Sequence, residues 1–200
     1  MIKNLIFDFG DIFINLDKGV VLRGIEKFGG TNVSHELQET NDLYEVGDIS
    51  SKEFISRLQT NFPKATPEEI VAIWNSMLLD FPDYRLNFVE NLSSKGNYRL
   101  FLLSNTNDLH ILHFIEKVGQ EKYERFKNCF EQFYLSHEIR LRKPTPEIFN
   151  FVLEQNGLVA TETLFIDDSK ENTDAAKALG IKTWNLLVGQ EDVTDLKSKL

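Results

Sequence analysis

Cysteine and long apolar runs are nearly absent from the sequence, and each absence excludes a class of protein. Cys129 is the single cysteine, so the chain cannot form an internal disulfide, which is typical of a reducing compartment. The chain has no uninterrupted apolar stretch of about 18 residues, and its first apolar run is too short for a signal peptide. We therefore expect a cytoplasmic protein without a membrane partner.

Basic residues are outnumbered by acidic ones, which gives a formal net charge of −9 at pH 7. Nucleic-acid binding needs a basic surface, so we expect no nucleic-acid partner. A small phosphorylated ligand stays compatible with this charge, because a local cation or metal ion outweighs the overall field. The length of 200 residues suffices for one core with a small appended domain, and leaves the oligomeric state open.

Five short apolar segments, each bounded by polar residues, predict buried β-strands. They span residues 2–9, 98–105, 131–136, 162–168 and 182–187. Helical patterns separate the last four of these segments, over residues 108–119, 146–157 and 170–180. Strands that alternate with helices indicate parallel crossover connections, so we predict an α/β fold with a Rossmann-like parallel sheet.

The region between the first two predicted strands has no strand pattern and several helix starts. Ser50 and Thr66 each stand three positions before a glutamate, which is the spacing of a capping box. After Thr66, apolar residues recur at helical spacing up to Met77. We therefore predict an all-helical insert of about seventy residues, and expect Trp74, Phe81 and Tyr84 to pack within it.

Polar side chains follow each of the first four predicted strands. They are Asp8 after the first, Ser104 and Asn105 after the second, Lys143 after the third, and Asp167 and Asp168 after the fourth. In a parallel sheet, ligands bind outside the carboxyl ends of the strands, so these groups converge on one edge. A carboxylate can attack phosphorus, paired acids can hold Mg²⁺, and lysine and hydroxyl donors stabilise phosphoryl oxygens. The set predicts phosphoryl transfer.

Four segments resemble, in order, the four motifs of the haloacid dehalogenase superfamily. They are FDFGDI (7–12), LLSN (102–105), RKP (142–144) and FIDD (165–168). The segments LSNTN (103–107) and LRKPTPEIF (141–149) make the chain most similar to sugar-phosphate phosphatases typified by bacterial α-D-glucose-1-phosphate phosphatase. The resemblance implies a Mg²⁺-dependent phosphatase of a small phosphorylated metabolite, with a sugar phosphate as first choice. It also implies a HAD-like core (1–16 and 89–200) and a small helical cap domain (17–88).

The resemblance assigns the metal ligands and the nucleophile to specific residues. It implies that Asp8 attacks phosphorus, forms an aspartyl-phosphate and also binds Mg²⁺, together with the backbone carbonyl of Gly10. Asp168 is expected to bind the metal directly, and Asp167 directly or through a water molecule.

The same resemblance assigns the residues that hold the phosphoryl group. Ser104 and Lys143 are expected to bind it, and Asn105 to orient it. Lys143 is also expected to support catalysis by neutralising charge, and Asn172 to support the acidic loop.

The position two residues after the nucleophile departs from the family pattern. Most phosphatases of the superfamily carry there an aspartate that protonates the leaving group, and this chain has Gly10. General acid–base catalysis contributes roughly 10²- to 10⁴-fold, so we expect slow turnover of esters with poor leaving groups. Asp11 is interpreted as a hydrogen-bonding residue of the loop and is not assigned a catalytic role.

Two other functions stay open at this stage. The first is dehalogenation, in which the carboxylate attacks carbon without Mg²⁺; the acid pair Asp167 and Asp168 disfavours it. The second is a non-catalytic phospholigand-binding or interaction protein that has lost its acid–base residue. Glu45 and Asp48, in the predicted cap, are interpreted as solvent-exposed residues, although contact with the substrate is the alternative.

Overall fold

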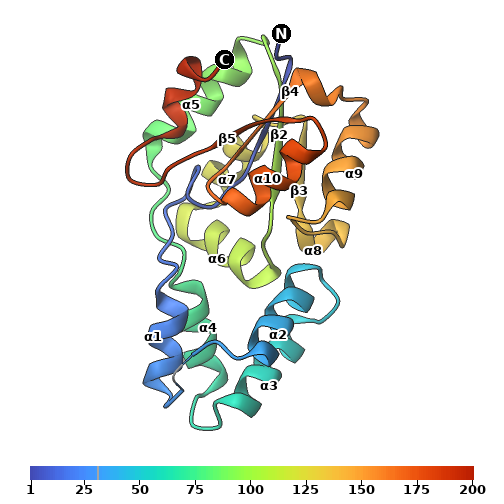
Figure 1. The fold of residues 1–200 in the computed structure, drawn as a ribbon. Helices are drawn as coiled ribbons and strands as arrows, with labels where there is room; N and C mark the ends of the chain where they lie inside the picture. Colours follow the sequence, from blue (N-terminus) through green and yellow to red (C-terminus); the bar gives the residue numbers. More distant parts are fainter. Residues whose placement is uncertain (31) are drawn as a thin grey trace.

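The computed structural model describes residues 1–30 and 32–200, and a five-stranded parallel sheet lies at its centre (Figure 1). The strands are β1 (Asn4–Phe7), β2 (Arg99–Ser104), β3 (Gln132–Leu135), β4 (Thr163–Asp167) and β5 (Lys182–Asn185). Their order in the sheet is β3-β2-β1-β4-β5, and every neighbouring pair is parallel. The five predicted strands and the α/β fold class are confirmed.

Two layers of helices cover the two faces of the sheet. On one face lie α5 (Asp83–Ser94), α6 (Asp108–Val118), α7 (Gln120–Lys127) and the 3₁₀ helix η2 (Val193–Ser198). On the other face lie α9 (Pro146–Asn156) and α10 (Lys170–Ala178). Successive side chains of β1 point to opposite faces of the sheet. Leu5 and Phe7 therefore pack under the α5–α7 layer, and Ile6 packs under the α9–α10 layer.

A separate group of helices lies beyond the carboxyl edge of the sheet (Figure 1). It contains α1 (Val20–Lys27), α2 (His35–Glu45), α3 (Ser51–Asn61) and α4 (Pro67–Asn75). The Thr66 capping box is complete, whereas Ser50 accepts a hydrogen bond from Glu53 N–H without the reciprocal bond. The α2–α4 part has a small core of its own around Tyr44, Ile49 and Phe54.

Two chain segments connect this group of helices to the sheet, and they run side by side. Asn15 N–H donates to the Asp80 carbonyl and Leu79 N–H donates to the Asn15 carbonyl, both at 2.9 Å. Asp17 N–H donates to the Met77 carbonyl, also at 2.9 Å. The helical group is therefore connected to the core by two paired segments, one before α1 and one after α4.

Helix α5 begins before residue 88, where the predicted cap ends, and packs on the core. Its residues Leu86 and Val89 belong to the larger core cluster, as does Phe81 just before it. The expectation that Phe81 and Tyr84 pack with the insert is wrong, because Phe81 contacts the core ring Phe114 and the Tyr84 hydroxyl donates to Asp192. The physical reason is that the chain leaves the helical group before Phe81, which already packs in the core beside the sheet.

The predicted helix over residues 108–119 continues after a break into a second helix. Gly119 has φ +86°, which ends α6, and α7 then runs over Gln120–Lys127. Short α8 (Ser136–Ile139) follows β3, and η1 (Ala160–Glu162) precedes β4.

Among the described residues, no helix combines the length and the apolar character that crossing a bilayer requires.

Candidate active site

A buried lysine bridges two buried carboxylates at the carboxyl edge of the sheet. Lys143 Nζ donates to Asp8 Oδ1 and to Asp167 Oδ2, each at 2.7 Å. Asp8 follows β1, Asp167 ends β4, and Lys143 lies on the loop after α8, with its side chain 1% exposed. The structure therefore brings together three of the residues that the sequence predicts for the site.

Burial and ion pairing have opposite effects on the pKa values of Asp8 and Lys143. Burial raises the pKa of Asp8 to about 7, with Asp167 adding to the rise and the Lys143 ammonium opposing it. Burial by itself lowers the pKa of Lys143, but the two adjacent carboxylates outweigh burial and raise the pKa above its ordinary value. Lys143 therefore stays a cation, and a further cation at this site would favour the ionised form of Asp8.

Three carboxylates lie close enough to share one metal ion. Oxygen atoms of Asp8, Asp167 and Asp168 lie within 4.8 Å of one another. A set of carboxylate oxygens fits a hard cation such as Mg²⁺, which prefers oxygen ligands. The three predicted carboxylate ligands thus lie close together. That the Gly10 carbonyl also binds the metal stays a prediction.

Neighbouring side chains fix the acidic loop after β4. Asp167 accepts hydrogen bonds from Ser169 N–H at 2.8 Å and from Asn172 Nδ2 at 3.1 Å on both carboxylate oxygens. The Asn185 amide donates to the Asp168 carbonyl at 2.8 Å. The predicted supporting role of Asn172 is confirmed.

Lys18 is a site neighbour that the sequence analysis missed. Its ammonium forms ion pairs with Asp168 and with Asp11, the latter at 2.9 Å. Burial raises the pKa of Asp168, and Lys18 opposes this rise. Lys18 is 150 positions from Asp168, so no local sequence pattern relates them.

Asp11 has the loop role that the sequence predicts. Its backbone is left-handed, with φ +54°, and Oδ1 accepts a hydrogen bond from Leu16 N–H at 3.0 Å. The other oxygen pairs with Lys18, so both oxygens of this carboxylate have partners.

The two predicted phosphoryl-binding residues after β2 differ in what their side chains do. Ser104 is buried at the end of β2, and within the described part of the chain its hydroxyl has only a long contact of 3.4 Å with the Asn105 carbonyl. The Asn105 amide donates to the Lys143 carbonyl at 2.8 Å and accepts from Lys143 N–H at 2.9 Å. In this structure the Asn105 side chain therefore fixes the backbone of Lys143.

Gly10 leaves room that a hydrophobic side chain occupies. A Cβ atom added at Gly10 would lie 2.7 Å from Leu16 Cδ1 and 4.0 Å from Asp8 Oδ2. The space beside the predicted nucleophile, where an aspartate side chain would stand, is thus filled by the end of Leu16.

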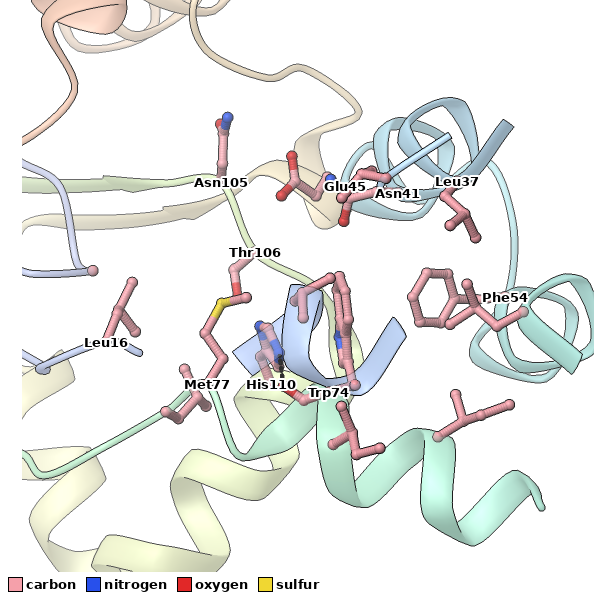
Figure 2. Close-up of a pocket in the computed structure, with 18 of the residues that line it drawn as sticks. Leu16, Leu37, Asn41, Glu45, Phe54, Trp74, Met77, Asn105, Thr106 and His110 are labelled. Carbon is pink, nitrogen blue, oxygen red and sulfur yellow. Dashed lines mark hydrogen bonds between the residues drawn. The ribbon is translucent and has the colours of Figure 1, made fainter. Parts of the chain in front are cut away.

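A cavity of about 350 Å³ lies between the helical group and the carboxyl edge of the sheet (Figure 2). Gly10, Ser104 and Asn105 line its core side. Apolar residues of α1, α2, α3 and α4 form most of the opposite wall, which we call the cap wall: Val21, Ile25, Leu37, Phe54, Leu58, Ile70, Ile73 and Trp74. The cavity therefore joins the predicted phosphoryl site to an apolar space.

Glu45 lines this cavity, so its interpretation as a solvent-exposed residue is wrong. Its side chain is 18% exposed and pairs with Arg142 at 2.9 Å, and Arg142 also pairs with Asp42 at 3.1 Å. Burial raises the pKa of Glu45, and Arg142 opposes this rise. Asp48, in contrast, is exposed and pairs with the exposed Arg140.

An aromatic contact joins α4 to α6 at the far side of the cavity. The Trp74 and His110 rings stack with centroids 5.0 Å apart, and His110 Nε2 lies 3.1 Å from the Trp74 carbonyl. A carbonyl only accepts, so Nε2 donates and Nδ1 accepts from the Asn107 amide at 3.3 Å. Burial lowers the pKa of His110 to about 4, which keeps this ring neutral.

Comparison with known proteins gives relatives of the same general design. The family model described as haloacid dehalogenase-like hydrolase matches residues 5–186. A D-ribitol-5-phosphate phosphatase from Bacteroides thetaiotaomicron is 27% identical over 190 residues, covering 92% of this chain and 91% of the relative. A phosphorylated carbohydrates phosphatase from Thermotoga maritima is 30% identical over 124 residues, covering 61% of this chain and 53% of the relative.

A solved structure extends the likeness over nearly the whole chain. It is the wild-type form of a HAD family enzyme from Bacteroides thetaiotaomicron, in complex with magnesium and inorganic phosphate. It is 35% identical and covers 96% of this chain and 97% of that one, with a TM-score of 0.76. With the family match over most of the sequence and the same parallel fold, the chain belongs to the haloacid dehalogenase-like hydrolase family.

Proposed function

We propose that this protein is a Mg²⁺-dependent phosphatase that hydrolyses the monoester of a small phosphorylated metabolite through an aspartyl-phosphate on Asp8. The observation that carries the proposal is the bridge of Lys143 Nζ between Asp8 and Asp167, at 2.7 Å to each, beside the third carboxylate, Asp168. The relatives that act on phosphorylated carbohydrates, and the one that binds magnesium and phosphate, support it.

In the proposed first step, an Asp8 carboxylate oxygen attacks phosphorus, and the bond from phosphorus to the ester oxygen breaks. The organic group leaves as an alkoxide and takes a proton from water, because Gly10 provides no acid. Water then attacks the phosphoryl group, which releases phosphate and regenerates the Asp8 carboxylate. Lys143 would donate to a phosphoryl oxygen during both steps, since its ammonium already lies beside Asp8.

The three carboxylates and the Gly10 carbonyl would hold the metal ion, which supplies positive charge against the phosphoryl oxygens when it is bound. Asp167 is the most firmly held of the three carboxylates, through Lys143, Ser169 and Asn172. Ser104 and the Asn105 backbone are proposed to hold the phosphoryl group at the core side of the cavity.

The helices α1–α4 are proposed to act as the cap that covers the substrate. They supply the cap wall of the cavity, whereas α5 packs on the core. A sugar phosphate is the first candidate substrate, because two relatives act on phosphorylated carbohydrates or ribitol 5-phosphate.

The test compares Asp8→Asn with the parent protein on p-nitrophenyl phosphate at matched Mg²⁺. Loss of a covalent nucleophile is expected to lower kcat by about 10⁴-fold or more. Asp174→Asn, which changes an exposed aspartate, is the matched control and is expected to keep its activity. Retained turnover in Asp8→Asn would contradict the nucleophile assignment.

Two further measurements separate the proposal from its competitors. Mass spectrometry of acid-quenched protein is expected to find a phosphoryl group on the peptide that contains Asp8. A screen of glucose 1-phosphate, glucose 6-phosphate and ribitol 5-phosphate is expected to give Mg²⁺-dependent phosphate release. Release that is independent of Mg²⁺ contradicts the metal-dependent mechanism, and absence of any turnover favours a binding protein.

A further inference from the structure

The cavity above the predicted phosphoryl site has a composition that differs from a polyol-binding site. Its core side carries Ser104 and Asn105, but the cap wall is built from aliphatic and aromatic side chains. Leu37, Phe54 and Trp74, all from cap helices, are drawn around this space in Figure 2. A site for a sugar needs a hydrogen-bond partner for each hydroxyl that it buries.

Two polar groups on the cap side of the cavity, Gln38 and Glu45, already have partners, and the Asn41 amide lines the same side. The Gln38 amide donates to Asp42 at 3.1 Å, and Glu45 pairs with Arg142 at 2.9 Å. On the core helix α6, both ring nitrogens of His110 are also engaged, with the Trp74 carbonyl and the Asn107 amide. Among the described lining residues, the cap side therefore offers a polyol the Asn41 amide and few other hydrogen-bonding groups that are not already paired.

The size of the cavity suits a substantial apolar group. An engineered cavity of about 150 Å³, lined by Leu, Ile and Phe, stays dry and binds benzene. The present cavity is about 350 Å³, more than twice that volume. Burial of an apolar group there removes its surface from water and contributes affinity in proportion to the area buried.

The glycine at position 10 adds a requirement on the leaving group. Leu16 Cδ1 occupies the place that an acid side chain would take, so the space beside Asp8 is apolar as well. Esters of phenols suit such a site, because a phenol ionises near a pKa of about 10, as in tyrosine, and its anion leaves without an acid. Two independent observations, the cap wall and Gly10, thus point to the same substrate class.

We propose that the cavity gives this site a further substrate class beside sugar phosphates, namely phosphate monoesters of apolar phenols. This inference rests on the proposed phosphatase function. The phosphoryl group binds at Ser104 and Lys143, and the ring with its apolar substituent lies against the cap wall. The bond from phosphorus to the phenol oxygen breaks, the phosphoryl group passes to Asp8, and the phenolate takes a proton from water.

The test uses a series of phosphate esters from phenyl to 4-methyl-, 4-propyl- and 4-pentylphenyl phosphate. The leaving groups in this series ionise alike, so the series varies apolar size alone. We expect kcat/KM to rise about fourfold per added methylene, the equivalent of about 0.8 kcal/mol, until the cavity is full. Replacement of the 4-methyl group by 4-hydroxymethyl is expected to lower kcat/KM.

Leu37→Asn tests whether the cap wall causes this rise, since Leu37 is buried in that wall. We expect the gain per methylene to fall to less than twofold. Leu22→Asn is the matched control, because Leu22 is 42% exposed on α1 and does not line the cavity. If Leu37→Asn does not fold, Val33→Asn provides a second variant, because Val33 lines the cavity and is 46% exposed.

A binding measurement keeps the inference separate from the phosphatase function. The same alkyl series, prepared as phenylphosphonates that cannot be hydrolysed, is titrated into the Mg²⁺-loaded protein with Trp184 replaced by phenylalanine, and binding is followed by the fluorescence of Trp74, which lines the cavity. Affinity that rises with chain length supports the cavity assignment even if no ester is turned over. Turnover of all esters with no dependence on chain length overturns the inference and leaves the phosphatase function standing.

Discussion

The two sides of the candidate active site are built from opposite chemistry. On the core side, behind the lining residues Gly10, Ser104 and Asn105, lies the cluster of Asp8, Lys143 and Asp167, in which Lys143 donates to each buried carboxylate at 2.7 Å. The opposite side is the cap wall, made of apolar residues from four helices. Under the proposed function the difference separates two tasks, because a phosphoryl group is common to all monoesters and the cap wall is expected to contact the part that varies.

The two sides also differ in how sensitive they are to substitution. Removal of one member of a buried charge cluster leaves its partners without compensation, which is strongly destabilising. The cap wall holds no such charge cluster, so we expect a changed side chain there to leave no buried charge without a partner. The predictions below test this contrast.

Substitution of Lys143 by methionine is expected to have the largest effect on stability. In metal-free protein at pH 8 it leaves Asp8 and Asp167 buried without their cation, which costs about 3–5 kcal/mol. Urea unfolding in the presence of a chelator measures the loss. Lys170→Met, at an exposed lysine, is the control, and an equal small loss in both variants would contradict the prediction.

The buried His110, at the contact between α4 of the helical group and α6 of the core, is expected to make stability depend on pH. Its pKa is about 4 in the folded state and about 6.5 when unfolded, so only the unfolded chain binds a proton between these values. The neutral, buried His110 therefore makes its full contribution to the free energy of unfolding above pH 6.5. This free energy falls by up to about 3 kcal/mol as the pH drops to 4. Unfolding curves of wild type and His110→Gln give the difference, and parallel pH profiles would contradict this assignment.

Gly10→Asp tests the core side beside the nucleophile. An added acid is expected to raise kcat on alkyl phosphates by about 10- to 100-fold and to change little on p-nitrophenyl phosphate. The gain is expected in full only with Leu16→Ala, because Leu16 Cδ1 lies 2.7 Å from the position of the new Cβ. The measurement is a rate series over leaving groups of graded pKa, and a flat series for the wild type would show that an acid is already present.

The ion pairs between the α1–α4 helical group and the core are expected to have the smallest effect on stability. Arg142→Gln removes pairs with Glu45 and Asp42, and its half-buried position predicts a loss of about 1 kcal/mol. Arg140→Gln removes an exposed pair with Asp48 and is expected to change stability by less than about 0.5 kcal/mol. Thermal unfolding compares the two, and an equal loss would argue against burial as the cause.

The core side of the site was predictable because it depends on a general property of parallel sheets. Asp8, Ser104 and Asp167 each stand at the carboxyl end of a buried strand, so their convergence follows from strand recognition, whereas Lys143 comes after β3 and α8. The role of Asn172 was predictable for the same reason, because it lies on the loop and helix start that follow β4.

Other features depend on contacts that no local pattern encodes. Lys18 reaches Asp168 across 150 positions, and Arg142 reaches Glu45 across 97. Phe81 was predicted to pack in the insert because apolar spacing does not say which neighbour a side chain meets, and it packs on Phe114 of the core. The break at Gly119 between α6 and α7 lies within a pattern that continues as a helix on both sides.

The sequence by itself determined the parallel sheet, the order of the four polar segments and the glycine in place of an acid, because these depend on local periodicity and residue type. Only the tertiary structure decided that Lys143 lies between two carboxylates, that Leu16 fills the space beside Gly10, and that the cap wall is apolar. The reason is physical: a cavity is made by side chains from helices far apart in the sequence, and its shape exists only after those helices have packed.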